Sequence, residues 1–269
     1  MFNKQRAEPG MTISAKYSHE NPLRKSVYLT RNSDPWRTRA QLAYIAARRV
    51  LFSLQNRPSP TLETDVLTSL RHEAIIVTIP KSGSRSLLAA FLDRWSDQEG
   101  VWSETTSLQA LLRKDLNRRE YRVLAVVRNP WDRVYSCYRD KIVRLDRGRR
   151  RAHLIARYEG LRPFMPFDAF VSWLGSEEGT DERADRHWAS QSAFLRVENE
   201  YRCDHVFKLE QISDEVDRLR DILGEPDFQI PRTNIFGNTL ARHDVYNSYT
   251  RAIVEKRYAE DIDRFRYAF

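Results

Sequence analysis

A lysine, a glycine and three serines share one short segment, Lys81-Ser-Gly-Ser-Arg-Ser86. Hydroxyl groups and the backbone N–H groups at a helix N-terminus donate hydrogen bonds to phosphate oxygens, and a lysine adds a full positive charge. A glycine lets the ligand approach the backbone closely. The segment therefore predicts a phosphate-binding loop. It differs from the Walker A loop, because G-x-x-x-x-G-K-[ST] is absent and Lys81 stands before the glycine.

A second pair of candidate phosphate ligands, Arg128 and Ser136, stands eight residues apart. Asn129 suits a helix N-cap and Pro130 suits the first helical turn, so a helix that carries Ser136 is predicted to begin here. If the strands before the two motifs are neighbours, Arg128 and Ser136 hold a second phosphate near the first. Two phosphate sites suit a nucleotide that carries phosphates at both ends.

Each motif follows an apolar segment with the composition of a buried strand, at Ala74–Pro80 and Tyr121–Val127. Helical spacing of apolar residues follows each motif, at Leu87, Leu88, Phe91, Leu92 and Trp95 and then at Val134, Tyr138 and Ile142. Two successive strand–loop–helix units predict an α/β fold with a parallel sheet. The ligand of such a fold lies beyond the carboxyl ends of the strands.

Further apolar patterns predict the remaining elements. They are a short helix at Phe167–Leu174, a strand at His205–Leu209, a helix with Ile212, Val216, Leu219 and Leu223, and a closing helix with Val254, Tyr258, Ile262 and Phe265. Residues 1–35 are polar and aperiodic, and a basic helix with Leu42, Ile45, Ala46, Val50 and Leu54 on one face follows. We expect this helix to pack on the domain, with a membrane surface as the alternative.

We therefore divide the chain into residues 1–70, an N-terminal arm with a basic amphipathic helix, and residues 71–269, the domain that carries both motifs. No apolar run reaches the length of a membrane span, and no apolar segment follows the basic N-terminus as in a secretory signal. We expect a soluble, cytoplasmic protein. Cys137 and Cys203 fit no metal spacing and are expected to be small buried residues without a disulfide.

The chain of 269 residues has a net charge of +8, which favours anionic partners. Part of this excess lies in Lys141–Arg157, and we expect its arginines to border the site of an anionic acceptor, at Arg147, Arg149, Arg150 and Arg151. A solvated loop is the alternative. A nucleic-acid partner is not expected, because no recognisable nucleic-acid-binding motif is present.

The two motifs resemble those of sulfotransferases that use 3′-phosphoadenosine 5′-phosphosulfate (PAPS). Ile79–Leu88 is similar to the 5′-phosphosulfate loop of that family, and Val127–Tyr138 is similar to its 3′-phosphate motif. Val206–Glu210, the His187-Trp188 pair and Tyr258–Phe269 extend the resemblance to the carbohydrate sulfotransferases, of which this chain looks like a soluble bacterial member. The resemblance runs from about Glu73 to Phe269.

The resemblance implies a P-loop-like three-layer fold, with a central parallel β-sheet flanked by helices. It also implies that the 5′-phosphosulfate is held by Lys81, Ser82, Gly83, Ser84, Arg85 and Ser86. Arg128 and Ser136 then hold the 3′-phosphate, and the late 3′-phosphate loop of the family is placed at Arg232-Thr-Asn234. The reaction it implies is transfer of the sulfuryl group to an acceptor hydroxyl, with adenosine 3′,5′-bisphosphate as product and no metal.

The general base stays open between His187 and Glu104. His187 has a suitable ordinary pKa, whereas glycan-modifying relatives place a catalytic Glu about as far past the first loop as Glu104. The expected acceptor is a hydroxyl of a polysaccharide, lipopolysaccharide or glycolipid. Two alternatives remain: a nucleotide or small-molecule kinase on a P-loop-like scaffold, and a non-catalytic module that binds polyanions.

Overall fold

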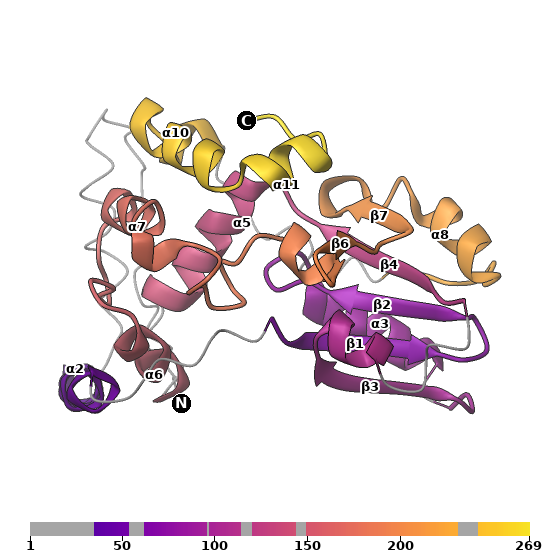
Figure 1. Ribbon diagram of the computed structural model, residues 1–269, viewed down its shortest axis with the longest axis horizontal. Helices are drawn as coiled ribbons and strands as arrows, with labels where there is room; N and C mark the ends of the chain where they lie inside the picture. The colour runs from indigo at the N-terminus through magenta and orange to yellow at the C-terminus, as the bar shows by residue number, and fades with distance from the viewer. Residues whose placement is uncertain (1–34, 54–61, 96, 114–119, 144–148, 231–241) are drawn as a thin grey trace, which may run out of the picture. The chain divides into compact units, whose positions relative to one another are not determined.

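The central sheet has five strands in the order β3-β1-β2-β4-β7. Their bounds are Thr64–Ser69 (β1), Ala74–Thr78 (β2), Val101–Thr106 (β3), Arg122–Val127 (β4) and His205–Lys208 (β7). The computed structural model describes residues 35–53, 62–95, 97–113, 120–143, 149–230 and 242–269. β2, β4 and β7 are parallel neighbours (Figure 1). The two strands that carry the predicted phosphate motifs therefore lie side by side.

β1 is a strand that the sequence analysis did not predict, and it runs antiparallel to both β2 and β3. The sheet is thus mostly, and not entirely, parallel. The segment TDVLTS has too many hydroxyl groups to look like a buried strand, yet Thr64, Thr68 and Ser69 are buried. The Thr64 hydroxyl donates to the carbonyl of Thr78 on β2. β1 belongs to the sheet although it precedes residue 71, the predicted start of the domain.

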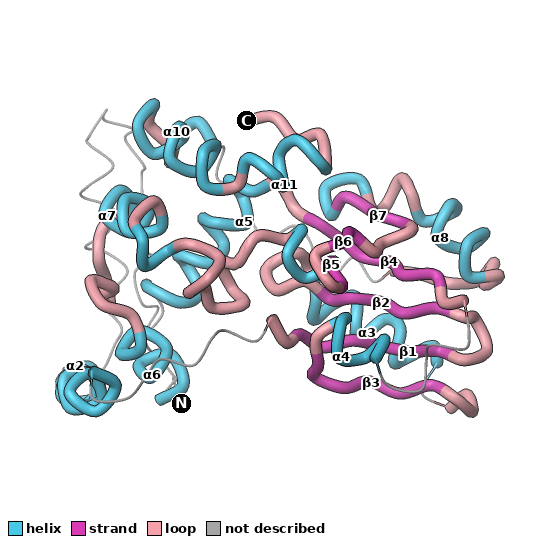
Figure 2. Tube along the Cα trace, viewed as in Figure 1, coloured by secondary structure: helices cyan, strands magenta, loops and turns pink. Residues whose placement is uncertain are grey.

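Apolar side chains from both faces of the sheet enter two cores, so the predicted three-layer α/β arrangement is confirmed. On one face, Ile76 and Leu124 pack with α3 (Ser84–Trp95) and α8 (Val216–Leu223). On the other face, Ile75 and Val123 share a core with three further helices, α4 (Leu108–Arg113), α5 (Pro130–Cys137) and α7 (Phe167–Leu174). Figure 2 shows the strands in magenta, with α3 and α4 overlapping them in this view.

The helices that follow the two motifs are confirmed. α3 begins at Ser84, directly after the first loop, and α5 begins at Pro130 with Asn129 as its N-cap. The Asn129 side chain accepts a hydrogen bond of 3.1 Å from the N–H of Trp131. A π-helical turn, Tyr138–Val143, continues α5, and such turns are frequent at functional sites.

The predicted closing helix is two helices, α10 (Ser248–Arg257) and α11 (Ala259–Arg264). They separate at Tyr258, whose φ of −115° and ψ of 29° are not helical. Its hydroxyl donates to the carbonyl of Trp188 at 2.7 Å, so the buried ring fixes the break. The last short elements are β5 (Arg196–Val197), β6 (Glu200–Tyr201) and α9 (Arg242–Val245).

The basic helix forms as α2 (Pro35–Ser53) and packs beside α6 (Arg149–Arg157). The prediction of which residues form its buried apolar face is partly wrong. Ile45 is buried, but Leu42 is 44% exposed and Val50 is 63% exposed, because the helix turns Tyr44 and Arg49 toward its neighbours. Tyr44 Oη lies 3.3 Å from His153 Nδ1, and Arg49 donates to the carbonyl of Leu161. Among the described helices, none combines the length and the apolar character needed to cross a membrane.

The expectation for both cysteines is confirmed. Cys137 is a buried thiol and Cys203 a half-buried one, and neither forms a disulfide. Burial raises the pKa of the Cys137 thiol to about 12, which makes it a poor nucleophile.

Candidate active site

The first loop joins the carboxyl end of β2 to the N-terminus of α3. Lys81 and Gly83 both adopt left-handed backbone conformations, with φ of 71° and 75°. A Cβ at Gly83 would lie only 2.7 Å from Leu209 Cδ1, so the loop is packed tightly from behind. The first hydrogen bond of the helix joins the N–H of Leu87 to the carbonyl of Gly83. The N-terminus of α3 thus follows the loop directly, as an anion-binding loop requires.

The Lys81 ammonium forms an ion pair in this structure. Its Nζ lies 2.9 Å from Asp140 Oδ2, and Lys141 Nζ lies 3.4 Å from the same oxygen. Asp140 comes from the π-helical turn after α5, so the helical segment that follows the second motif supplies the partner of Lys81. Burial lowers the pKa of the Lys81 ammonium, and Asp140 opposes that shift. A nearby anion such as Asp140 therefore stabilises the charged form of Lys81.

Arg128 directly follows β4 and reaches the first loop. Its Nη1 donates to the carbonyl of Lys81 at 3.3 Å. Burial lowers the pKa of this guanidinium too, while Asp132 and Glu210 oppose the shift. Ser136 lies in α5, half-buried. The structure thus brings the predicted neighbours, Lys81 and Arg128, to one edge of the sheet.

The other predicted ligands differ in their exposure. Ser84 and Ser86 are half-buried at the start of α3, and the Arg85 side chain is exposed. Ser82 is 1% exposed, and its hydroxyl donates to Gln191 Oε1 at 2.8 Å. The Ser82 hydroxyl therefore faces the protein interior and already has an acceptor. As a ligand of the donor nucleotide, Ser82 stays a prediction.

Arg133 is a buried residue of the second motif that the sequence analysis did not single out. It is 1% exposed, and its guanidinium donates to the carbonyls of Pro80 at 3.0 Å, Ala189 at 2.7 Å and Arg186 at 3.4 Å. Pro80 directly precedes Lys81, and residues 186–189 include His187. Arg133 therefore holds the first loop and the segment of His187 against the same helix.

His187 is paired with Asp185. The carboxylate Oδ1 of Asp185 accepts hydrogen bonds from His187 Nδ1 and, at 3.0 Å, from the His187 backbone N–H. A carboxylate at Nδ1 selects the tautomer whose Nε2 carries the lone pair. Burial lowers the pKa of His187, and Lys141 and Lys81 add to that shift against the opposing Asp185. The neutral ring, which can accept a proton, is therefore the favoured form near neutral pH.

Glu104, the other candidate base, lies on the edge strand β3. It stands opposite Val66 of β1, which in turn stands opposite Val77 of β2. Two strand spacings, about 9–10 Å, separate its backbone from β2. Its Oε1 accepts a hydrogen bond of 3.3 Å from Trp102 Nε1. The contacts described here connect His187, rather than Glu104, with the elements around Lys81.

Four residues of this site escaped the sequence analysis: Arg133, Asp140, Asp185 and Gln191. Asp185 stands two residues before His187, and that spacing was the only available signal. The other three make contacts over 53 to 109 positions of sequence. The predicted residues Arg147 and Arg232–Asn234 lie outside the described residues. Arg149, Arg150 and Arg151 lie in α6, where only their backbone is described.

Comparison with known proteins gives one match. The model of a family described as the sulfotransferase family matches residues 64–268, which include β1 and both motifs. No curated protein matches the chain. No solved structure matches it either.

Proposed function

The chain belongs to the sulfotransferase family, and we propose that it transfers the sulfuryl group of PAPS to a hydroxyl of a carbohydrate. The observation that carries this proposal is the meeting of two half-buried cationic residues beyond the ends of neighbouring parallel strands. Arg128 Nη1 lies 3.3 Å from the carbonyl of Lys81, so the two motifs are in direct contact. A nucleotide with phosphates at both ends suits such a pair of sites.

The residues present fit this nucleotide. Burial lowers the pKa of both Lys81 and Arg128, so an anion bound beside them stabilises the charged forms that burial disfavours. When bound, PAPS supplies an activated sulfuryl group. The proposed ligands of its 5′-phosphosulfate are Lys81, Ser82, Gly83, Ser84, Arg85 and Ser86, and those of its 3′-phosphate are Arg128 and Ser136.

The proposed chemistry needs a base and a cation, and the charge of Lys81 is close enough to His187 to help lower the pKa of its ring. His187 Nε2 accepts the proton of the acceptor hydroxyl, while Asp185 holds the ring by Nδ1. Lys81 donates to the oxygen that becomes negative as the bond to sulfur breaks. For this step Lys81 must exchange its present partner, Asp140, for the leaving oxygen. Glu104 is the alternative base.

The proposed acceptor is a glycan intermediate of the cytoplasm, a polysaccharide, lipopolysaccharide or glycolipid. The support is the similarity of Val206–Glu210 and Tyr258–Phe269 to the glycan-modifying branch of the family. The basic segment that contains Arg147–Arg151 favours an acceptor that is itself anionic.

Transfer of labelled sulfate from PAPS to a panel of glycan acceptors tests the proposal. We expect the wild-type protein to label at least one glycan and the Lys81→Ala variant to label it at least about 10²-fold more slowly at the same protein concentration. If label appeared on tyrosyl peptides or simple alcohols instead, sulfuryl transfer would be supported and the choice of a glycan as acceptor would be refuted.

A second measurement tests the donor. Adenosine 3′,5′-bisphosphate is expected to raise the melting temperature, because a ligand that binds only the folded state stabilises it. ATP with Mg²⁺ should raise it less. An equal or larger rise with ATP and Mg²⁺ would favour a kinase and contradict the choice of PAPS.

A further inference from the structure

Gln191 is a fully buried residue whose side chain joins the two phosphate-binding motifs. Its Oε1 accepts hydrogen bonds of 2.8 Å from the Ser82 hydroxyl and of 2.8 Å from the Arg128 N–H. Its Nε2 donates to the Arg128 carbonyl at 2.8 Å. The amide oxygen thus accepts from both motifs, and the amide nitrogen donates to the second motif alone. At 0% exposure it contacts no ligand.

This connection lies beyond the region where the sheet itself fixes the strands. The register of β2 with β4 ends at Val77 and Ala125. Ser82 and Arg128 follow these positions and are therefore outside the ladder of backbone hydrogen bonds. Beyond the paired strands, the hydrogen bonds of the Gln191 amide connect the first loop to the backbone of Arg128.

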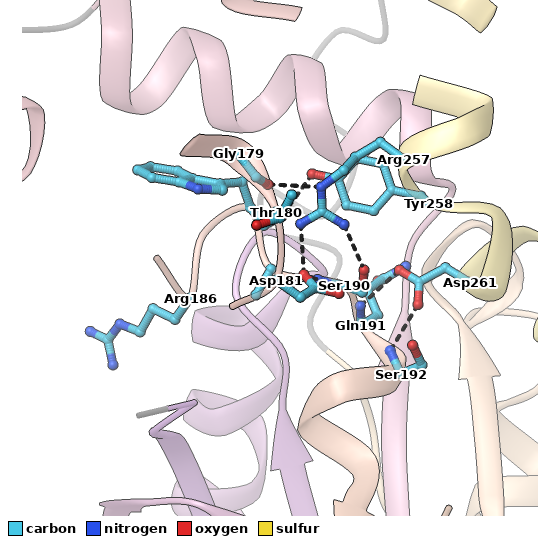
Figure 3. Close-up of polar contacts among 12 residues, drawn as sticks. Gly179, Thr180, Asp181, Arg186, Ser190, Gln191, Ser192, Arg257, Tyr258 and Asp261 are labelled. Carbon is cyan, nitrogen blue, oxygen red and sulfur yellow. Dashed lines mark hydrogen bonds and ion pairs between the residues drawn. The ribbon is translucent and has the colours of Figure 1, made fainter. Parts of the chain in front are cut away.

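The backbone of Gln191 is anchored in turn by the C-terminal helices. Asp261 of α11 accepts from the N–H of Gln191 at 2.7 Å and from the N–H of Ser192 at 2.8 Å (Figure 3). Arg257 of α10 donates to the Gly179 carbonyl at 2.8 Å, to Ser190 Oγ at 3.1 Å and to Asp181 Oδ1 at 2.6 Å. Figure 3 shows both side chains directed at the segment that carries Gln191.

We propose that Gln191 is a positioning residue that sets the distance between the two phosphate-binding motifs, and that Asp261 fixes Gln191 in place. The proposal rests on the proposed function, since it takes both motifs to hold phosphates of one nucleotide. A ligand with two phosphates gains from two sites only when their spacing matches its own, as in any bivalent contact. A ligand with one phosphate has no such requirement.

The test compares three ligands on the wild-type protein and on Gln191→Met, which keeps the size of the side chain and removes its hydrogen bonds. The ligands are adenosine 3′,5′-bisphosphate, adenosine 5′-monophosphate and adenosine 3′-monophosphate, and their Kd values are measured by calorimetric titration or by competition. We expect Gln191→Met to raise the Kd of the bisphosphate about tenfold or more. The Kd values of the two monophosphates should stay within about threefold of wild type, because each motif keeps its own ligands.

A second variant guards against misfolding of the first. Asp261→Asn keeps the size of the side chain and one acceptor oxygen, and it lies outside both motifs. It should show the same selective loss of bisphosphate affinity, to a smaller extent. The matched control is His72→Asn, at the other end of β2. His72 is also buried, with hydrogen bonds of 2.7 Å to Ser69 and 2.8 Å to Glu225, so its loss lowers the melting temperature without changing any Kd.

Three outcomes are distinguishable. Selective loss of bisphosphate affinity in Gln191→Met and Asp261→Asn supports the proposal. Equal losses for all three ligands, or none, in variants that melt no lower than His72→Asn would overturn it. Failure of the wild-type protein to bind the bisphosphate more tightly than either monophosphate would instead refute the proposed function on which it rests.

Discussion

Lys81 and Arg128 are both half-buried cations, but the proposed function gives them different roles. In that proposal Lys81 acts on the leaving oxygen, whereas Arg128 holds the donor nucleotide in both ground state and transition state. Lys81→Ala should therefore lower kcat by about 10²-fold or more, the usual loss when one transition-state donor is removed. Arg128→Ala should mainly raise the Kd of adenosine 3′,5′-bisphosphate. Steady-state kinetics and calorimetry on both variants give these values, and unchanged turnover in Lys81→Ala would contradict the assignment.

The proposed role of His187 predicts how kcat/KM depends on pH. Burial lowers the pKa of this residue, so the ring is neutral at neutral pH. With His187 as the proposed base, kcat/KM should rise with pH through a value below 6.5 and then stay level. Asp185 opposes that shift, so Asp185→Asn should move the midpoint to a still lower pH and reduce kcat. His187→Ala should lower kcat by about 10²–10⁴-fold. If Glu104→Gln abolishes turnover while His187→Ala does not, Glu104 is the base.

The residues of the site divide into two groups by how they could be predicted. Lys81 and Arg128 follow apolar strands, and parallel neighbours bring such residues together, so the sequence predicted that the two motifs lie near each other if their strands are neighbours. Gln191 and Asp140 act through contacts that span many positions, at 109 residues from Ser82 and 59 from Lys81. No local pattern encodes which loop they meet.

At the scale of the elements, the loop between β2 and α3 depends on Gly83. Its φ of 75° disfavours any side chain, and a Cβ would meet Leu209. Gly224 has a similar φ of 66° with nothing within 4 Å of an added Cβ, which makes it a matched control. Gly224→Ala should cost about 1–2 kcal/mol of unfolding free energy, the price of the left-handed conformation alone.

Gly83→Ala should lower the unfolding free energy more than Gly224→Ala does, because Leu209 must also move. Urea titration of both variants measures the two values. It should weaken binding of adenosine 3′,5′-bisphosphate, whereas Gly224→Ala should not. Equal unfolding free energies and equal affinities in the two variants would show that Leu209 yields without disturbing the loop.

The elements that the sequence predicted well are those with a strong apolar pattern. β2 and β4 are continuous apolar segments, and the structure confirms both. α7 spans Phe167–Leu174, the predicted residues. β1 was missed because its buried Thr and Ser residues look like those of a loop. β3 was missed because it is an edge strand that contains exposed polar residues and lacks a continuous apolar run. The break between α10 and α11 depends on Tyr258 and Trp188, a contact over 70 positions.

At the scale of the whole molecule, a second buried polar cluster lies at the end of the sheet away from the phosphate motifs. Glu225 accepts hydrogen bonds from His72 at 2.8 Å and from Arg94 at 2.9 and 3.1 Å. The His72 ring stacks on Trp95 with centroids 4.3 Å apart. The cluster joins the turn between β1 and β2 to α3 and to Glu225, the second residue after the end of α8.

This cluster predicts sensitivity to acid. Burial would raise the pKa of Glu225, but the hydrogen bonds from His72 and Arg94 outweigh it, and the pKa is lowered from its ordinary 4.5. A carboxyl group whose pKa is lower in the folded state stabilises the fold at any pH above its pKa in the unfolded state. That stability is lost as the pH falls through its pKa in the folded state. The difference in melting temperature between wild type and Glu225→Gln should therefore shrink below about pH 4.5.

The exposed pair Glu198 and Arg113 provides the control, because an ion pair on the surface adds little stability. Glu198→Gln should leave the melting temperature unchanged at every pH. A difference between wild type and Glu225→Gln that stays constant from neutral to acidic pH would show that the carboxylate contributes nothing as a charge.

The anchoring of Gln191 by Asp261 also bears on the order in which the protein becomes functional during synthesis. Both phosphate-binding motifs leave the ribosome well before Asp261, which is 70 positions beyond Gln191. Contacts between such distant positions form late in folding, because a long loop must close first. A nascent chain can therefore complete its sheet and both loops while their spacing is still unset. We therefore expect the proposed nucleotide to bind tightly only after α11 has docked, so that an unfinished chain competes little for it.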